Sequence, residues 1–195
     1  MLDFKLKNIS YRDKDLPILG NYSWAPEVIY DYENDQYVIL YSDTEAKNSP
    51  IYAVTTKDFE RFSYPFIFFD AGFTIIDANI TMFDGKYYLF YKGEDVERYG
   101  TLYYAVSDNL SCDSEWQIYD NEITGDHNLE GPFGLKDLDN MNYLFADAFE
   151  VAKPYYGLFD YDSKINMKNI KDLNEVHHFS ILKITKSEYE RLMEE

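Results

Sequence analysis

Three acidic residues, Glu27, Asp77 and Glu130, open similar segments of the sequence. The first two are fifty residues apart (27 to 77), and the second and third are fifty-three apart (77 to 130). Carboxyl groups around one pocket can cleave a glycosidic bond, because one acid protonates the leaving oxygen while another carboxylate activates water. The alternative interpretation is that these acids cap strand ends or bind a structural ion. Either way, the repeat must bring them together.

The repeat predicts what positions these acids. Each acid is followed by a short apolar run, a turn rich in Asp, Asn or Gly, and an aromatic run, as in "PEVIYDYENDQYVILYS" and "IDANITMFDGKYYLFYK". Asp84-Gly85 between two such runs predicts a β-hairpin. Further strand-like segments match at 51–59 and 102–110. Four antiparallel strands per unit of about fifty residues are typical of a β-propeller blade. The alternative is a β-sandwich with chance resemblance between hairpins.

We therefore predict an incomplete, all-β, single-domain β-propeller over 1–195. Its expected parts are the end of a preceding blade at 1–22, three blades at 23–72, 73–125 and 126–175, and a closing strand with a short helix at 176–195. Thr185 and Glu188 match a capping box at the start of that helix. In a propeller the innermost strands line one channel, so the three acids are expected to converge there.

Composition narrows the class of ligand. Asp and Glu number 36 against 18 Lys and Arg, a formal net charge of −18, so binding to nucleic acid or to an anionic membrane is not expected. A neutral sugar is compatible, and the 20 Tyr and 14 Phe offer flat faces for sugar rings to stack on. The sequence shows neither a membrane-spanning run nor a signal peptide, so a cytoplasmic location is expected.

A family resemblance follows from the order of four segments. "WAPEVIYD", "IIDANI…DGKYYLFYK", "EGPFGLK…YLFAD" and the closing "VHHFSILKITKSEYERL" resemble glycoside hydrolase family 43, whose members are five-bladed propellers acting on arabinose- and xylose-containing glycans. The resemblance implies an oligosaccharide or plant-type polysaccharide substrate and an inverting mechanism. It requires no cofactor and allows a structural calcium ion on the propeller axis.

The resemblance also assigns roles to individual residues. Glu130 matches the general acid, and Asp77 matches the carboxylate that orients that acid and tunes its pKa. Trp24 matches a tryptophan that shapes the sugar pocket, and Glu27 is expected to be a second pocket carboxylate. His178 matches an axial histidine that often supports a hydrated metal ion.

Two departures leave the activity open. The family's general base belongs to an Asp-Pro motif, and this sequence contains no Asp-Pro dipeptide. His177-His178-Phe179 stands where Arg-His-Gly is usual, and we interpret His177 as a structural histidine rather than a ligand. One hypothesis is the acid-bearing part of a glycosidase. The other is a non-catalytic propeller fragment that binds sugar, or a subunit completed by self-association or by a second chain.

Overall fold

The computed structural model describes residues 23–43, 48–110, 115–125, 128–161 and 163–193. They form three four-stranded antiparallel sheets, in each of which the strands pair in chain order. The first sheet contains β1 (Trp24–Asp31), β2 (Gln36–Ser42), β3 (Ile51–Thr56) and β4 (Phe66–Phe69). The second contains β5 (Ile75–Phe83), β6 (Lys86–Gly93), β7 (Thr101–Ser107) and β8 (Gln117–Tyr119). The third contains β9 (Leu129–Lys136), β10 (Asn142–Ala148), β11 (Lys153–Leu158) and β12 (Lys168–Asn169).

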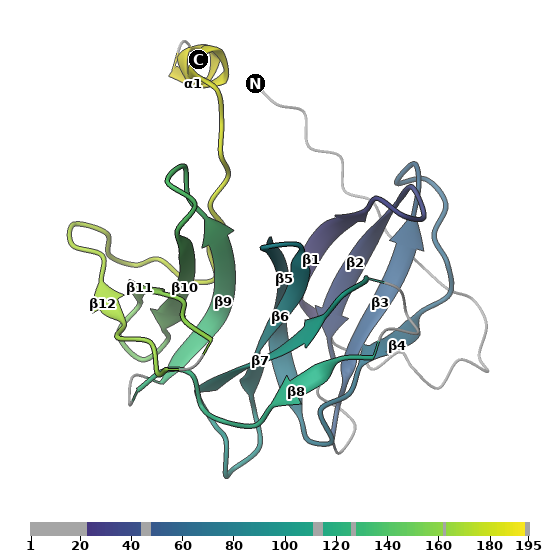
Figure 1. Ribbon diagram of the computed structural model, residues 1–195, viewed down its shortest axis with the longest axis horizontal. Coiled ribbons are helices and arrows are strands. Elements are labelled where there is room, and N and C mark those ends of the chain that lie inside the picture. The colour runs from purple at the N-terminus through teal and green to yellow at the C-terminus, as the bar shows by residue number, and fades with distance from the viewer. Residues whose placement is uncertain (1–22, 44–47, 111–114, 126–127, 162, 194–195) are drawn as a thin grey trace.

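The three sheets are held together by two apolar layers. Side chains alternate between the faces of a strand, so β6 buries Tyr87, Leu89 and Tyr91 against the first sheet and Tyr88 and Phe90 against the third. The second sheet is therefore packed on both faces. Figure 1 shows it between the other two, with β1, β5 and β9 toward the centre.

The only helix among the described residues is α1 (Lys186–Met193), which stands apart from the sheets at the end of the chain (Figure 1). Thr185 Oγ1 accepts a hydrogen bond from the Glu188 backbone N–H at 3.3 Å. The Glu188 carboxylate accepts one from the Thr185 backbone N–H at 2.8 Å. The predicted capping box is thus confirmed. None of the helix's side chains is buried.

The predicted fold class is confirmed: the chain is nearly all β, with three blade-like sheets whose described strands do not close into a ring. The predicted hairpin is also present, since Phe83 pairs with Lys86 across Asp84 and Gly85, both of which have positive φ. Residues 1–22, expected to end a preceding blade, lie outside the described residues. The predicted blade boundaries stay predictions.

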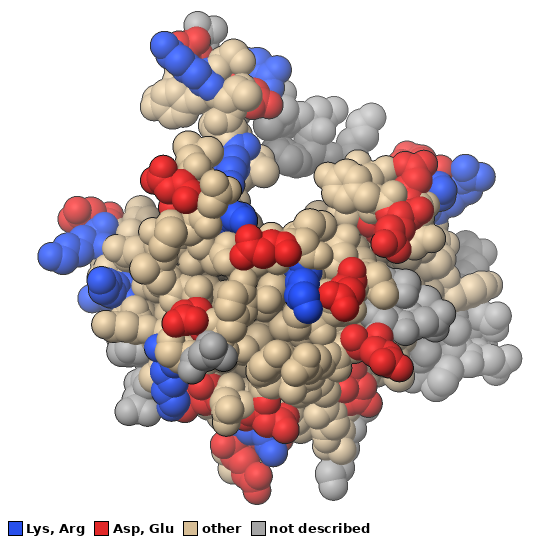
Figure 2. Space-filling view, viewed as in Figure 1, with Lys and Arg blue, Asp and Glu red and all other residues tan. Residues whose placement is uncertain are grey.

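Acidic side chains are spread over the surface seen in Figure 2, and Lys and Arg are interspersed rather than gathered in one basic patch. Among the described residues, no helix is long and apolar enough to cross a membrane.

Candidate functional site

The same irregularity occurs in the innermost strand of every sheet. In each case two residues of the inner strand lie opposite one residue of its neighbour, which is a β-bulge. The bulges lie at Trp24–Glu27, Ile76–Asn79 and Glu130–Phe133. The second residue of each has a positive φ: 47° at Ala25, 58° at Asp77 and 54° at Gly131. A bulge changes the direction of the side chains in it. The type of residue at the positive-φ position therefore determines which chemical group each blade points toward the centre.

The register corrects the expected equivalence of Glu27, Asp77 and Glu130. Glu27 pairs with Leu40 just as Asn79 pairs with Phe90, so Asn79 is the counterpart of Glu27. The reason is the turn between the first two strands, which is four residues long (32–35) against two (84–85) in the second sheet. Equal sequence spacing therefore matched different positions. The three acids converge, but they come from different register positions along their strands.

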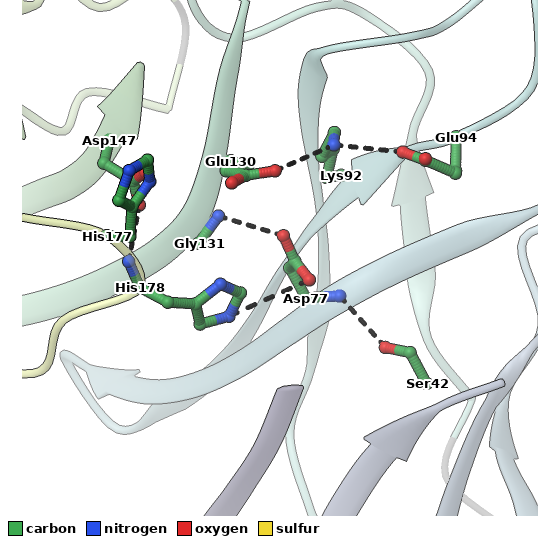
Figure 3. Close-up of polar contacts among 9 residues, drawn as sticks. All are labelled: Ser42, Asp77, Lys92, Glu94, Glu130, Gly131, Asp147, His177 and His178. Carbon is green, nitrogen blue, oxygen red and sulfur yellow. Dashed lines mark hydrogen bonds and ion pairs between the residues drawn. The ribbon is translucent and has the colours of Figure 1, made fainter. Parts of the chain in front are cut away.

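Asp77 is the most deeply set of these three acids, with 5% of its surface exposed. Its Oδ2 accepts a hydrogen bond from the Gly131 backbone N–H at 3.1 Å, and its own N–H donates to Ser42 Oγ at 3.1 Å. The His178 Nε2 lies 3.8 Å from its Oδ1 (Figure 3). Burial raises the pKa of Asp77, and the nearby His178 and the Gly131 hydrogen bond offset part of that effect.

Glu130 reaches the same place from β9, and its side chain is 22% exposed. Its Oε2 lies 3.1 Å from Lys92 Nζ, and Lys92 also lies 3.0 Å from Glu94 Oε2. The side chain of Lys92 is only 3% exposed, with its ammonium over the rings of Tyr99 and Phe149 at 5.1 and 4.7 Å. Burial lowers the pKa of Lys92, but the hydrogen bonds to Glu94 and Glu130 outweigh burial, and the pKa is raised.

Lys92 is a site residue that the sequence interpretation missed. It ends the aromatic run "KYYLFYK" of β6, pairs with Ile76 on β5, and is buried where its neighbours along the strand are apolar. A charged residue at a buried position of an otherwise apolar strand was the available signal, because buried lysines are rare unless paired.

Glu27 and Trp24 lie on β1, on the other side of the centre. The Asn79 side-chain amide donates to Glu27 Oε1 at 3.1 Å. Burial raises the pKa of Glu27, whereas the Asn79 hydrogen bond and the nearby His178 lower it. Glu27 therefore faces the same histidine as Asp77. Trp24 lies at the exposed start of β1, with 48% of its surface accessible, and its role in stacking on a sugar stays a prediction.

The closing segment completes the site through Asp147 on β10, which is fully buried. Its Oδ1 accepts a hydrogen bond from the His178 backbone N–H at 2.9 Å, and His177 Nδ1 lies 3.3 Å from its Oδ2. Burial raises the pKa of Asp147, while the His178 hydrogen bond acts in the opposite direction. His177, interpreted from sequence as structural, is thus in contact with a buried carboxyl beside Glu130 (Figure 3).

Gly131 allows β10 and the closing segment to approach β9 closely. A Cβ at this position would lie 3.0 Å from Asp147 Oδ1 and 3.3 Å from His178 Cα, and the positive φ itself favours glycine. The closing segment can therefore pack on β9 only because residue 131 has no side chain.

One group of side chains in the described part of the chain could hold a metal ion: Glu130, Asp147 and His177, which each offer a ligand atom within 4.8 Å of the others. The predicted metal residue, His178, is not part of this group. Calcium takes six to eight oxygen ligands, whereas the ion-pair contact of the His178 ring is with Asp77 Oδ1 at 3.8 Å. A hydrated calcium ion at His178 stays a prediction.

Comparisons with known proteins relate this chain to glycosyl hydrolases. A family model described as "Probable glycosyl hydrolase domain", related to glycoside hydrolase family 43, matches residues 13–190. An α-L-arabinofuranosidase from Bifidobacterium longum is 29% identical over an alignment of 90 residues, which covers 37% of this chain and 8% of that protein.

Solved structures share the fold at low identity. The RS223 β-xylosidase gives a TM-score of 0.57 at 16% identity, over 77% of this chain and 60% of that one. A GH43 β-xylosidase/α-arabinofuranosidase from a compost metagenome, solved with xylotriose, gives 0.56 at 17%, over 83% and 64%. A GH62 α-L-arabinofuranosidase from Coprinopsis cinerea gives 0.60 at 12%, over 87% and 55%. The chain therefore spans less than two thirds of each of these proteins.

Proposed function

This chain belongs to the glycosyl hydrolase family related to family 43, and we propose that it is the acid-bearing part of an inverting glycosidase for arabinose- or xylose-containing glycans. The observation that supports this most is the pairing of two carboxyl groups across neighbouring inner strands. Asp77 is buried and hydrogen-bonded by Gly131 N–H, and Glu130 is the residue next to that glycine. Carboxyls in unequal surroundings are what acid catalysis of glycoside cleavage requires.

The two carboxyls are suited to different tasks. Glu130 is partly exposed and can touch a substrate, so we assign it the protonation of the leaving glycosidic oxygen. Asp77 is too deeply buried to reach the same atom, and we assign it the role of orienting Glu130 and sustaining its proton. The raised pKa of Asp77 fits this role, because the burial and the Glu130 charge that raise it also favour a proton held within the pair.

Lys92 must be accommodated in this proposal. A carboxylate that accepts a hydrogen bond from an ammonium has no proton to give, so the Lys92–Glu130 contact has to loosen before Glu130 acts. Glu94 provides for this, because it lies 3.0 Å from the same ammonium and can hold it alone. We therefore propose that the substrate, on entering, displaces Glu130 from Lys92 and leaves Lys92 with Glu94.

The other parts of the reaction come from the family resemblance. Water attacks the anomeric carbon directly, and its activating base is supplied from outside these residues. The solved relative that binds xylotriose supports a pentose-containing substrate for this chain as well. We place Trp24 and Glu27 at the sugar, with Glu27 as a hydrogen-bonding carboxylate.

The experiment is hydrolysis of arabinobiose and xylobiose, whose sugar leaving groups need protonation, by the purified chain, with its solution mass measured in parallel. Glu130→Gln should reduce turnover by at least about a hundredfold, the typical contribution of a general acid. Glu122→Gln, which makes the same change at a distant pair with Lys164, should leave it unaltered. A monomer that neither turns over these substrates nor binds xylotriose would contradict the proposal.

A second candidate function, a subunit completed by a partner, is favoured by the outer face of the third sheet. Tyr143 pairs with Leu135 and Phe145 with Phe133, so these two aromatics hold the positions at which Tyr88 and Phe90 pack on the next sheet. Here the corresponding face forms a groove of about 890 Å³. A further blade, from a second copy or another chain, would fit this surface. A stable higher-mass species that Phe145→Asp dissociates would favour this function.

A further inference from the structure

We propose that Glu130, Asp147 and His177 form a site for a divalent transition-metal ion of the zinc class. The site is distinct from a hydrated calcium ion at His178, because it uses the neighbouring histidine and two carboxylates from β9 and β10. It also goes beyond the proposed hydrolysis, which needs no metal ion.

The geometry of the three side chains fits one ion. Their ligand atoms lie within 4.8 Å of one another. His177 Nδ1 and Asp147 Oδ2 are 3.3 Å apart, about the separation of two ligands that each lie roughly 2.0–2.1 Å from a tetrahedral zinc ion. Two atoms at this distance need only small movements to share an ion.

Asp147 gives the second, independent indication. The residue is fully buried, and its Oδ2 accepts no hydrogen bond, although Oδ1 is held by the His178 backbone N–H. A buried carboxylate oxygen without a donor is costly, and a buried charge usually binds a metal ion or an opposite charge. His177 Nδ1, itself a potential ligand, lies 3.3 Å from Oδ2. An ion between the two would satisfy both.

The surrounding charges and the ligand types indicate which ion. Lys92 contacts Glu130 through Oε2, and Figure 3 shows the other oxygen of Glu130 toward Asp147 and His177. The Lys92 ammonium is balanced by Glu94, so two carboxylate charges are left for a divalent ion. One imidazole with two carboxylates suits zinc better than calcium, which prefers oxygen ligands alone and more of them.

An ion can enter this site from solvent, because His177 has 52% of its side-chain surface exposed. The bound ion would occupy the oxygen of Glu130 that would otherwise be free for a proton. If Glu130 is the general acid, a point that rests on the proposed function, zinc therefore opposes hydrolysis. The binding itself does not depend on that role.

The test is calorimetric titration of the metal-free chain with Zn²⁺, and with Co²⁺ read by its visible absorption. We expect one ion per chain, and at least a tenfold loss of Zn²⁺ affinity in His177→Ala, which removes a half-exposed side chain and should fold normally. His178→Ala is the matched control at the next residue and should keep most of the affinity. Ca²⁺ should not compete at similar concentration.

Three results would overturn the site. One is a wild-type chain that binds no Zn²⁺. Another is a His177→Ala chain that binds it as wild type does. The third is a loss of binding in His178→Ala alone. None of these measurements uses hydrolysis, so failure of the metal site and failure of the proposed function can be told apart.

Discussion

The bulges of β5 and β9 have the same backbone conformation, but the residues at their positive-φ positions differ in kind: one has a charged side chain and the other has none. In β5 the positive-φ position holds Asp77. This places a carboxyl group in a buried position, although the backbone conformation is unfavourable for a residue with a side chain. In β9 the same position holds Gly131, which adopts a positive φ without steric strain and leaves room for Asp147 and His178. One bulge presents a functional group, and the other makes space for the segment that faces it.

The bulge of β1 makes the comparison sharper. Ala25 holds the same position at φ 47° and has neither role. The bulge is therefore a property of the repeated blade, and chemistry enters through the side chain placed on it. A non-glycine residue there costs on the order of 1 kcal/mol or more.

The largest effect is expected from Gly131→Ala. A methyl group 3.0 Å from Asp147 Oδ1 forces the closing segment away, and the positive φ adds strain, so we expect a loss of about 2–4 kcal/mol in the free energy of unfolding. Urea denaturation measures it. Gly125→Ala, where a Cβ meets nothing within 4 Å, should change stability little. Equal effects of the two would contradict the role given to the β9 bulge.

Lys92→Met is expected to have the next largest effect. It leaves Glu130 and Glu94 without their shared cation in a partly buried place, for which we expect a loss of about 1–3 kcal/mol. Lys86→Met removes a cation paired with Asp108 at an exposed position and should cost under about 1 kcal/mol. A Lys92→Met chain as stable as wild type would show that the ion pair beside the β5 bulge is not structural.

A smaller, pH-dependent effect is expected from Asp77→Asn, which keeps the shape and tolerates positive φ. Because the pKa of Asp77 is raised in the folded chain, the unfolded chain loses this proton first as pH increases. The stability contribution of Asp77 therefore falls from its unfolded pKa up to its folded pKa and is constant above. The stability of Asp77→Asn relative to wild type should rise over that window. Asp108→Asn, at an exposed position, controls for net charge. A relative stability that is flat with pH would refute the raised pKa.

The sequence predicted the blades and the convergence of the acids, because alternation and turn residues are local signals. It did not predict the register. Because the turn at 32–35 is longer, equal sequence spacing did not identify the true counterparts of Glu27. The positive φ at Ala25 and Asp77 could not be predicted from the residue types at these positions. Lys92 and the Asp147–His177 contact were also missed, because they depend on how the second and third sheets and the closing segment pack.

The central claim is that Asp77 and Glu130 form an interacting carboxyl pair at the junction of β5 and β9. Its most direct test is a ¹³C NMR titration of the Asp77 side-chain carboxyl in wild type and in Glu130→Gln. The account predicts a pKa for Asp77 above the ordinary aspartate value, and a lower one when the Glu130 charge is removed. An ordinary pKa in wild type, or no change on substitution, would contradict it.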